Sequence, residues 1–266
     1  MKIFVTVKQV PDTTGKVSVK ADGTLDRASM ETVTNPDDLN AVEAALQLKE
    51  QTGARVITVT MGPMQAESML RELYAMGVDE AVLVSGREFG GSDTYATSQI
   101  IAAAIDTLGL EEGDIILSGR QAIDGDTAQV GPQIAEKLHL PQVSYAAEIT
   151  MKDNRLTIKR MLEDGYMMVQ VKTPCLITCV KELNEPRYMS VQGIEDCFDK
   201  EIRILAYDDL KDHPLIDKTT IGLAGSPTNI YKSFTPPQRS AGRMLSGSTA
   251  DMAAETARIL AEKHLI

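Results

Sequence analysis

The chain has 266 residues, of which 38 are acidic, 27 are basic and 43% are apolar, and its formal net charge is −11. This length and apolar content favour one large domain with its own core, joined to segments that need not fold alone. Because the charges form no basic tract, Trp is absent and no apolar stretch approaches the roughly 20 residues that cross a bilayer, we expect a cytoplasmic protein that neither binds nucleic acid nor inserts into a membrane.

Residues 1 to about 145 alternate short β-branched runs with segments of helix length. Strands are predicted at Ile3–Val7, Val56–Thr60, Ala81–Val84 and Asp114–Leu117. Helices are predicted after Asn35-Pro36, where Asn35 is the expected N-cap, and after Ser92-Asp93. This alternation predicts an α/β fold, with a parallel sheet, helices on both faces and right-handed crossovers.

The stretch from Ser118 to Pro132 follows a predicted strand and opens a helix. Asp126 and Gln129 have the spacing of a capping box, and Gly119 and Gly125 would let the backbone approach a phosphate at the helix start. These residues alone support an anion site and an ordinary capped turn nearly equally. The stretch matches neither G-x-G-x-x-G nor a Walker loop, which argues against a standard dinucleotide or kinase-like site.

The pattern changes between residues 146 and 180. Four short runs, joined by polar turns, predict an antiparallel addition to the main sheet: Ala147–Met151, Leu156–Lys159, Met167–Val171 and Cys175–Cys179. Cys175 and Cys179 share one face of a strand, and together with Cys197 they form an odd count without a C-x-x-C pair. Since the three histidines are also scattered, we expect buried structural thiols and neither a disulfide framework nor a structural metal.

Proline and glycine interrupt every periodic run after residue 184. A long irregular segment inside a compact domain is unusual, so we expect this part of the chain to reach onto a partner. A helix from Ala250 to about Glu262 is predicted near the end of the sequence.

Several separated motifs together resemble the electron-transfer flavoprotein beta subunit. The main ones are Val7-Lys8-Gln9-Val10, the Ser118–Pro132 stretch and Asn184-Glu185-Pro186-Arg187-Tyr188. Nearly the whole chain is covered, because similar family segments are Met61-Gly62-Pro63, Ala75–Asp79, Ile158–Thr178 and Pro236–Gly242. One departure is Met167, which stands where the family usually has Glu or Gln.

The resemblance implies a Rossmann-like fold that binds an adenine nucleotide. The implied cofactor-binding residues are Thr6, Lys8, Asn35, Pro36, Asp37, Asp38, Met61, Ser92, Thr94, Thr97, Gly119, Arg120, Gln121, Ala122, Ile123, Asp124, Gly125, Asp126, Thr127, Ala128, Gln129 and Val130. These positions follow strands or begin helices, where an α/β sheet places its ligands, so the physical and the family arguments agree on location. No general acid, base or nucleophile is assigned.

The two branches of this family differ in the nucleotide at that site. One branch holds AMP as a structural ligand, whereas the electron-bifurcating branch holds an FAD that accepts hydride from NADH. Bifurcation sends one electron to ferredoxin or flavodoxin and the other, through the alpha-subunit FAD, to an acyl-CoA dehydrogenase. Val10–Thr13, Gly90–Ser98 and Gly125 beside Asp124 resemble the bifurcating branch, so we expect FAD, with AMP as the alternative. A plain N-cap at Ser92 or Asp93 also explains part of this pattern.

The family resemblance also implies two partner surfaces. A docking loop at residues 187–196, including Arg187, Tyr188 and Met189, would anchor the dehydrogenase through Val191; the alternative is a surface loop packed on its own domain. Acidic residues 195–199 replace a lysine-rich continuation of some relatives, so charge preferences for the partner should differ. We expect residues 1–200 to form the nucleotide-binding domain and residues 201–266 an arm packed on the alpha subunit of a heterodimer. In a stress-response nucleotide-binding module that shares only the fold, the motifs at 184–188 and 236–242 would have no role.

Overall fold

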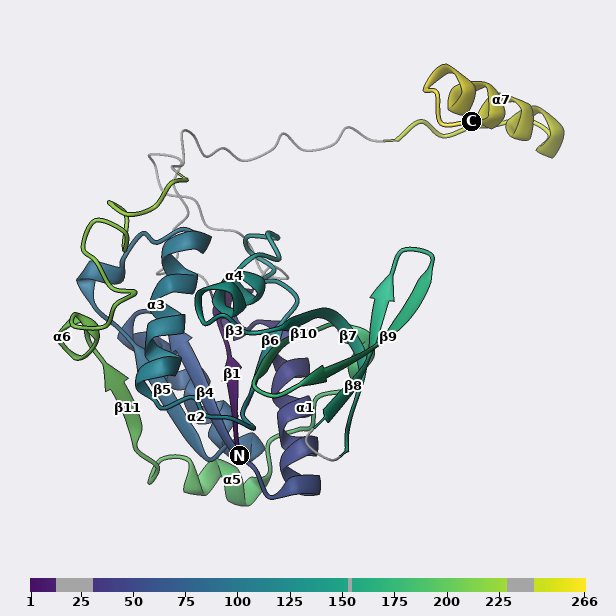
Figure 1. The fold of residues 1–266 in the computed structure, drawn as a ribbon. Helices are drawn as coiled ribbons and strands as arrows, with labels where there is room; N and C mark the ends of the chain where they lie inside the picture. Colours follow the sequence, from purple (N-terminus) through teal and green to yellow (C-terminus); the bar gives the residue numbers. More distant parts are fainter. Residues whose placement is uncertain (13–30, 153–154, 229–241) are drawn as a thin grey trace.

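The computed structural model describes residues 1–12, 31–152, 155–228 and 242–266. Thr13 and residues 236–241, which belong to motifs discussed above, lie outside these residues. A nine-stranded sheet has the order β11-β5-β4-β1-β6-β10-β7-β8-β9 (Figure 1). Its mutually parallel strands are β1 (Lys2–Thr6), β4 (Arg55–Met61), β5 (Glu80–Val84), β6 (Ile115–Gly119), β7 (Gln142–Lys152), β10 (Cys175–Cys179) and β11 (Ile202–Leu205). The sheet continues from β7 by antiparallel pairing with β8 (Arg155–Leu162), which in turn pairs antiparallel with β9 (Gly165–Lys172). A separate antiparallel pair is formed by β2 (Gln9–Pro11) and β3 (Thr32–Thr34).

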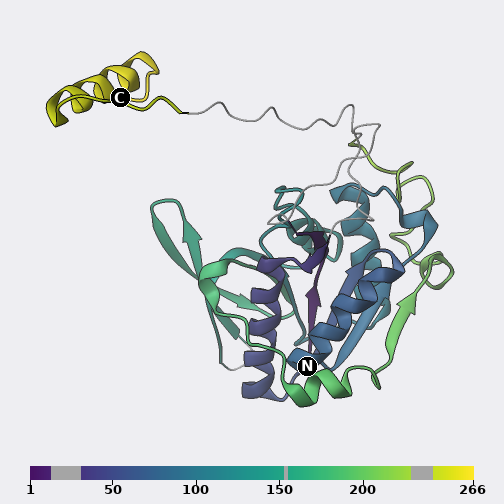
Figure 2. The same cartoon turned by 180° about the vertical axis from the view of Figure 1, so that it is seen from behind.

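Helices cover both faces of the sheet, as predicted, and each face has its own core (Figures 1 and 2). One layer contains α1 (Pro36–Thr52), α2 (Glu67–Met76) and α5 (Val191–Asp196), and the other contains α3 (Thr94–Thr107), α4 (Val130–Lys137) and α6 (Tyr207–Leu210). Strand β1 serves both cores, because Ile3 and Val5 pack in the first and Phe4 packs in the second. This alternation is what a strand covered on both faces requires.

The predicted antiparallel addition is wrong for its last strand, β10. It does not follow β7, β8 and β9 at the edge, but pairs in parallel with both β6 and β7 in the middle of the sheet. All five residues of β10 are buried, which is typical of a parallel strand covered by helices. Cys175 and Cys179 are therefore buried thiols, as expected, and burial raises the pKa of Cys175 to about 12.

The main sheet continues past residue 200, where the sequence predicts that the arm begins. Strand β11 pairs in parallel with β5 at the edge, and residues after it bury Leu210, Ile216 and Ile221. Strand β11 has only four residues, which are too few to show a clear alternation of buried and exposed side chains. The glycines after it interrupt the sequence pattern, but they let the backbone pack closely against neighbouring segments. A Cβ on Gly222, for example, would lie 2.2 Å from the carbonyl oxygen of Glu88. The arm therefore begins later than predicted.

Helix α7 (Thr249–Glu262) forms where the terminal helix is predicted. Ser248 is its N-cap, and the side chains of Ser248 and Asp251 form a capping box. Among the described residues, α7 buries none of its own, and Figure 1 shows it away from the sheet. Helix α7 therefore has no packing surface among the described residues of this chain.

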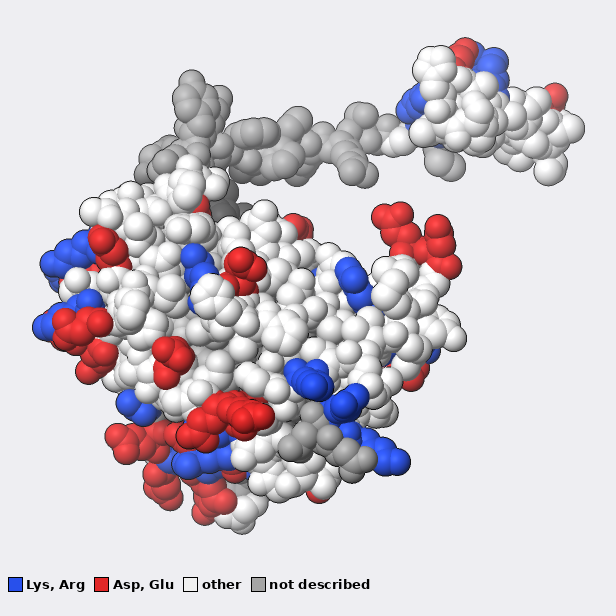
Figure 3. Space-filling view, viewed as in Figure 1, with Lys and Arg blue, Asp and Glu red and all other residues white. Residues whose placement is uncertain are grey.

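The surface in Figure 3 mixes acidic and basic side chains, with acidic ones gathered toward the lower left. Within the described ranges, no helix is both long enough and apolar enough to span a membrane.

Candidate functional site

A cavity of about 370 Å³ opens at the carboxyl ends of β1, β4 and β6. The chain leaves β1 toward β4 on one side, and later enters β6 on the other side of β1. The strand order therefore reverses beside β1, and in open α/β sheets ligands bind at such a switch point. We call this cavity the switch-point pocket.

Most of the residues implied by the resemblance lie around this pocket. Those that line it are Thr6, Lys8, Asp38, Met61, Ser92, Thr94, Thr97, Gly119, Arg120, Gln121, Ala122, Asp124, Gly125, Thr127, Ala128, Gln129 and Val130. The lining does not include Asn35, Pro36, Asp37, Ile123 and Asp126. Five segments distant in sequence thus meet at one cavity.

Asn35 occupies the N-cap position of α1, as predicted, but its side chain bonds elsewhere. Its Nδ2 donates to the carbonyl oxygen of Gln121 at 2.8 Å, and its Oδ1 accepts from the amide of Ile123 at 3.1 Å. Lys8 forms a second contact with the same loop, an ion pair in which its Nζ lies 2.7 Å from a carboxylate oxygen of Asp124. These contacts fix the loop of residues 120–129, which forms one wall of the pocket.

The predicted capping box of Asp126 and Gln129 is wrong. Helix α4 begins only at Val130, so Asp126 is too far upstream to cap it. Asp126 instead accepts from Nε2 of Gln121 at 2.7 Å, and Gln129 accepts from the Thr94 hydroxyl at 3.0 Å across the pocket. Asp126 and Ala128 also have φ angles of 50° and 51°, which is costly for residues other than glycine. Such strain in a well-braced loop is typical of binding sites.

Gly119 and Gly125 have different structural roles. A Cβ on Gly119 would lie 2.3 Å from a carboxylate oxygen of Asp38 and 2.7 Å from the backbone nitrogen of the same residue. The end of β6 thus packs directly against the start of α1, which only glycine permits. At Gly125 a Cβ would meet no described atom within 4 Å. Gly119 is therefore required for packing, whether or not a phosphate binds nearby.

We expect Gly119→Ala to lower the free energy of unfolding by about 1–3 kcal/mol, because overpacking forces rigid backbone apart. Gly125→Ala is the matched control, and its stability should stay within about 0.5 kcal/mol of wild type. Urea denaturation of the full chain measures both. Equal effects of the two substitutions would contradict the packing role of Gly119.

Asp38 joins the ends of two strands at the floor of the pocket. Its Oδ2 accepts from the amide of Lys8 at 2.8 Å, at the end of β1, and its Oδ1 accepts from the amide of Gly119 at 3.0 Å, at the end of β6. Burial raises the pKa of Asp38 to about 7, although these hydrogen bonds oppose the shift. Burial also raises the pKa of Asp37, whose carboxylate lies 3.3 Å from Nε of Arg120.

Five further residues line the pocket and were not singled out as binding residues by sequence: Val7, Asp93, Ile101, Ser118 and Gly131. Ser118 is the most informative, since its buried hydroxyl has no hydrogen-bond partner among the described residues. Unpaired buried polar groups are rare and costly, so this hydroxyl is an unusual feature of the pocket wall. Its position just before Gly119, at the end of a strand, is the signal that identifies it. A Cβ on Gly131 would lie 2.6 Å from the same hydroxyl, so the lack of a side chain at Gly131 lets α4 lie close to β6.

The motif at residues 184–188 fixes the docking segment, residues 187–196, to α1. Asn184 and Asn40 exchange side-chain and backbone hydrogen bonds of 2.8 and 3.0 Å. Arg187 donates from Nε and Nη2 to both carboxylate oxygens of the buried Glu43, at 2.8 and 3.0 Å, and from Nη1 to Glu50 at 2.6 Å. Arg187, predicted as a docking residue, thus has its guanidinium occupied within the chain.

Part of the predicted docking loop is a helix. Ser190 caps α5 by accepting from the amide of Gly193 at 2.9 Å. Gly193 does not interrupt the helix, but lets it approach α2, since a Cβ there would lie 2.3 Å from the carbonyl oxygen of Ala75. Tyr188 and Val191 are 97% and 85% exposed, so Val191 does not pack on its own domain.

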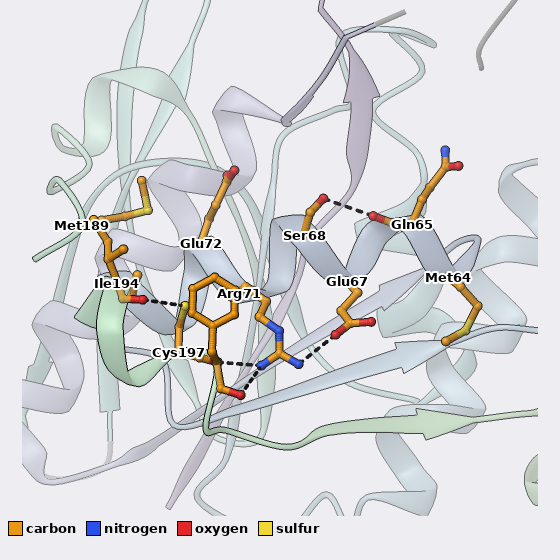
Figure 4. Close-up of a pocket in the computed structure, with 11 residues that line it drawn as sticks. Met64, Gln65, Glu67, Ser68, Arg71, Glu72, Met189, Ile194 and Cys197 are labelled. Carbon is orange, nitrogen blue, oxygen red and sulfur yellow. Dashed lines mark hydrogen bonds and ion pairs between the residues drawn. The ribbon is translucent and has the colours of Figure 1, made fainter. Parts of the chain in front are cut away.

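An apolar groove of about 570 Å³ lies beside the docking segment, between α2 and α5 (Figure 4). Met64, Met189 and Ile194 lie around it, and Phe198 adds an aromatic ring. Arg71 stabilises its wall by donating to the carbonyl oxygen of Cys197 at 2.6 Å. Both views of the fold place α5 near the amino end of β1 (Figures 1 and 2). The docking segment therefore lies at the amino ends of the parallel strands, and the switch-point pocket lies at their carboxyl ends.

Comparison with known proteins supports one family. Residues 22–210 match the electron transfer flavoprotein domain. The chain is 60% identical to the acryloyl-CoA reductase electron transfer subunit gamma of Anaerotignum propionicum, over 100% of both chains. It is 48% identical to the caffeyl-CoA reductase-Etf complex subunit CarD of Acetobacterium woodii and 48% identical to the electron transfer flavoprotein subunit beta of Clostridium acetobutylicum, again over 100% of both chains in each case. The domain match and these full-length relatives show that the chain belongs to the electron transfer flavoprotein family, among its beta subunits.

Proposed function

We propose that this beta subunit binds FAD in the switch-point pocket and works in electron bifurcation within a heterodimer. NADH would be the donor, and ferredoxin or flavodoxin and an acyl-CoA dehydrogenase would be the acceptors. The observation that carries this proposal is the full-length similarity to electron-transfer subunits that are named for acryloyl-CoA and caffeyl-CoA reductases. Their names associate this type of subunit with the reduction of acyl-CoA compounds.

The chemistry of the pocket fits an adenine nucleotide. Lys8 and Arg120 line the pocket and are paired with Asp124 and Asp37, and a nucleotide phosphate would compete with these carboxylates for the two cations. Bound FAD would supply hydride acceptance from NADH and one-electron transfer, since this chemistry belongs to the cofactor. The chain itself would bind and orient the nucleotide through residues at the ends of β1 and β6.

AMP is the alternative ligand, and the size of the pocket favours it. A volume of about 370 Å³ is near the lower limit of the range for small-molecule sites. FAD would therefore need room beyond this cavity. In a non-bifurcating protein with AMP, this chain would act as a scaffold that docks acyl-CoA dehydrogenases.

The exposed side chains of Tyr188 and Val191 and the groove beside them support a docking role for residues 187–196. An apolar anchor surrounded by less critical contacts is the usual form of a binding hot spot. The docking segment and the pocket lie at opposite ends of the parallel strands. We therefore propose that electrons reach the dehydrogenase through the alpha subunit. Helix α7, which lacks its own core, would pack on that subunit.

Nucleotide content tests the function. The heterodimer with its alpha subunit is purified, its nucleotides are released by acid, and each is quantified by chromatography. We expect two FAD and no AMP per heterodimer. One FAD with one AMP would refute bifurcation and leave the scaffold role.

A further inference from the structure

Residues 222–228, which we call the connector, are the last described residues before the arm that carries α7. The connector packs closely on the turn before α3. The amide of Leu223 donates to the carbonyl oxygen of Gly90 at 2.9 Å. A Cβ on Gly222 would lie 2.2 Å from the carbonyl oxygen of Glu88, and one on Gly91 would lie 2.9 Å from Cβ of Leu223. Neither side of this contact has space for a larger residue, so the connector packs in one defined position.

The buried hydroxyl of Ser226 ties the connector to the first residue before α3. It accepts from the amide of Asp93 at 2.8 Å and donates to the carbonyl oxygen of Gly222 at 2.7 Å. Ser226 does not itself line the switch-point pocket, whereas Asp93 does. One buried side chain thus joins the connector to the pocket wall.

Asp93 uses its two carboxylate oxygens for two different elements. Oδ1 accepts from the amide of Ala96 at 3.0 Å and caps α3, while Oδ2 accepts from the amide of Thr228 at 2.9 Å. These backbone hydrogen bonds outweigh the effect of burial and lower the pKa of Asp93, so the carboxylate stays charged at neutral pH. Any shift of Asp93 must therefore move both the connector and the start of α3, which carries the pocket residue Thr94.

We propose that Asp93 and Ser226 are positioning residues that couple nucleotide binding in the switch-point pocket to the seating of the connector. The inference rests on the proposed nucleotide site. A nucleotide that orders the pocket wall stabilises the seated connector, and by linkage the seated connector raises nucleotide affinity by the same factor. Since the connector is the last described segment before the arm, the state of the pocket biases the position of the residues that precede the arm.

Ser226→Ala tests the coupling in the heterodimer stripped of nucleotide, titrated with FAD and with AMP in parallel. Loss of the hydrogen bonds that the hydroxyl makes with Asp93 and Gly222 should weaken nucleotide affinity about 2- to 10-fold. Hydrogen exchange supplies the reciprocal measurement. In the wild type, nucleotide should slow exchange of the amides of Leu223, Ser226 and Thr228, and in the variant this protection should shrink.

Thr219→Ala is the matched control, because it removes a hydroxyl that bonds locally to Asp217 at 2.7 Å in the same part of the chain and does not line the pocket. Its affinity and its nucleotide-dependent exchange should equal those of the wild type. Unchanged affinity and unchanged protection in Ser226→Ala would overturn the coupling while leaving the nucleotide site intact. Failure of the wild-type pocket to bind either nucleotide would overturn the proposed function together with the coupling.

Asp93→Asn is a second variant, in case Ser226→Ala does not fold. An Asn side chain caps helices about as well as Asp, but its amide group replaces the oxygen that accepts from Thr228. Helix α3 should therefore keep its cap while the connector loses one bond. We expect faster exchange at Thr228 even without nucleotide, and identical exchange there would contradict the role of Asp93.

Discussion

Replacing Arg187 by Met is expected to lower the free energy of unfolding by about 3–5 kcal/mol, because it leaves the buried Glu43 carboxylate without its partner. The side chain of Glu43 is only 6% exposed, and Arg187 contacts both of its oxygens. Urea denaturation of the full chain measures the loss. Arg55→Met is the matched control: Nε of Arg55 lies 2.5 Å from Glu80, but both side chains reach solvent, at 62% and 31% exposed, so the loss should be below about 1 kcal/mol.

A double substitution separates the cost of an unpaired charge from the worth of the ion pair. Changing both Glu43 and Arg187 to Met should recover much of the stability, since apolar replacements of a buried pair are often neutral. A double variant as unstable as Arg187→Met would show that packing, and not the lone carboxylate, causes the loss.

The same pair predicts how stability depends on acid. Burial raises the pKa of Glu43, but hydrogen bonds from Arg187 outweigh it, so the net pKa is lowered in the folded protein. Its contribution to stability is therefore complete above the unfolded pKa of about 4.3 and is lost as the pH falls toward the folded value. In Arg187→Met this acid-dependent loss should shrink, and an unchanged acid profile would contradict the assignment.

The sequence predicts the main-sheet strands of the first half of the fold well, because each is long enough to show its pattern, whereas the three-residue strands β2 and β3 are missed. The strands predicted at residues 56–60 and 81–84 lie inside β4 and β5, and the helix after Asn35 begins where expected. Strand β11 is missed because it has only four residues and two of them, Arg203 and Ile204, are exposed at the sheet edge. No local pattern shows that β10 enters between β6 and β7, since pairing order is decided by tertiary packing.

The candidate site shows the same division. The end of β6 and the glycines around it are visible in the sequence, so the location of the pocket is predicted. The partners of individual side chains are not. Asn35 has an ordinary N-cap position, but it bonds a loop 86 residues further along the chain. Local sequence cannot show a bond of that range, and the same holds for the contact between Arg187 and Glu43.

Asp38→Ala is expected to cost about 2–6 kcal/mol, the second large effect. The carboxylate accepts from two buried backbone amides, those of Lys8 and Gly119, and each unpaired buried donor costs about 1–3 kcal/mol. Asp38→Asn keeps one acceptor and should cost about half as much. Because these bonds join β1 to β6 at the pocket floor, nucleotide retention by the heterodimer should fall with stability in the same order.

The dependence of stability on pH distinguishes the charge of Asp38 from its hydrogen bonds. Its pKa is about 7 in the folded protein, against about 3.9 when unfolded, so the folded state binds the proton more tightly. The free energy of unfolding should therefore fall as the pH rises from about 4 to about 7, and then level off. Asp38→Asn cannot titrate, so its profile should be flatter in this window, with a residual slope from Asp37, whose pKa is also raised. Denaturation midpoints at pH 5 and pH 8 measure the difference. An equal decrease in the wild type and in Asp38→Asn would show that another group holds the proton, and that the carboxylate at the pocket floor is already charged at pH 5.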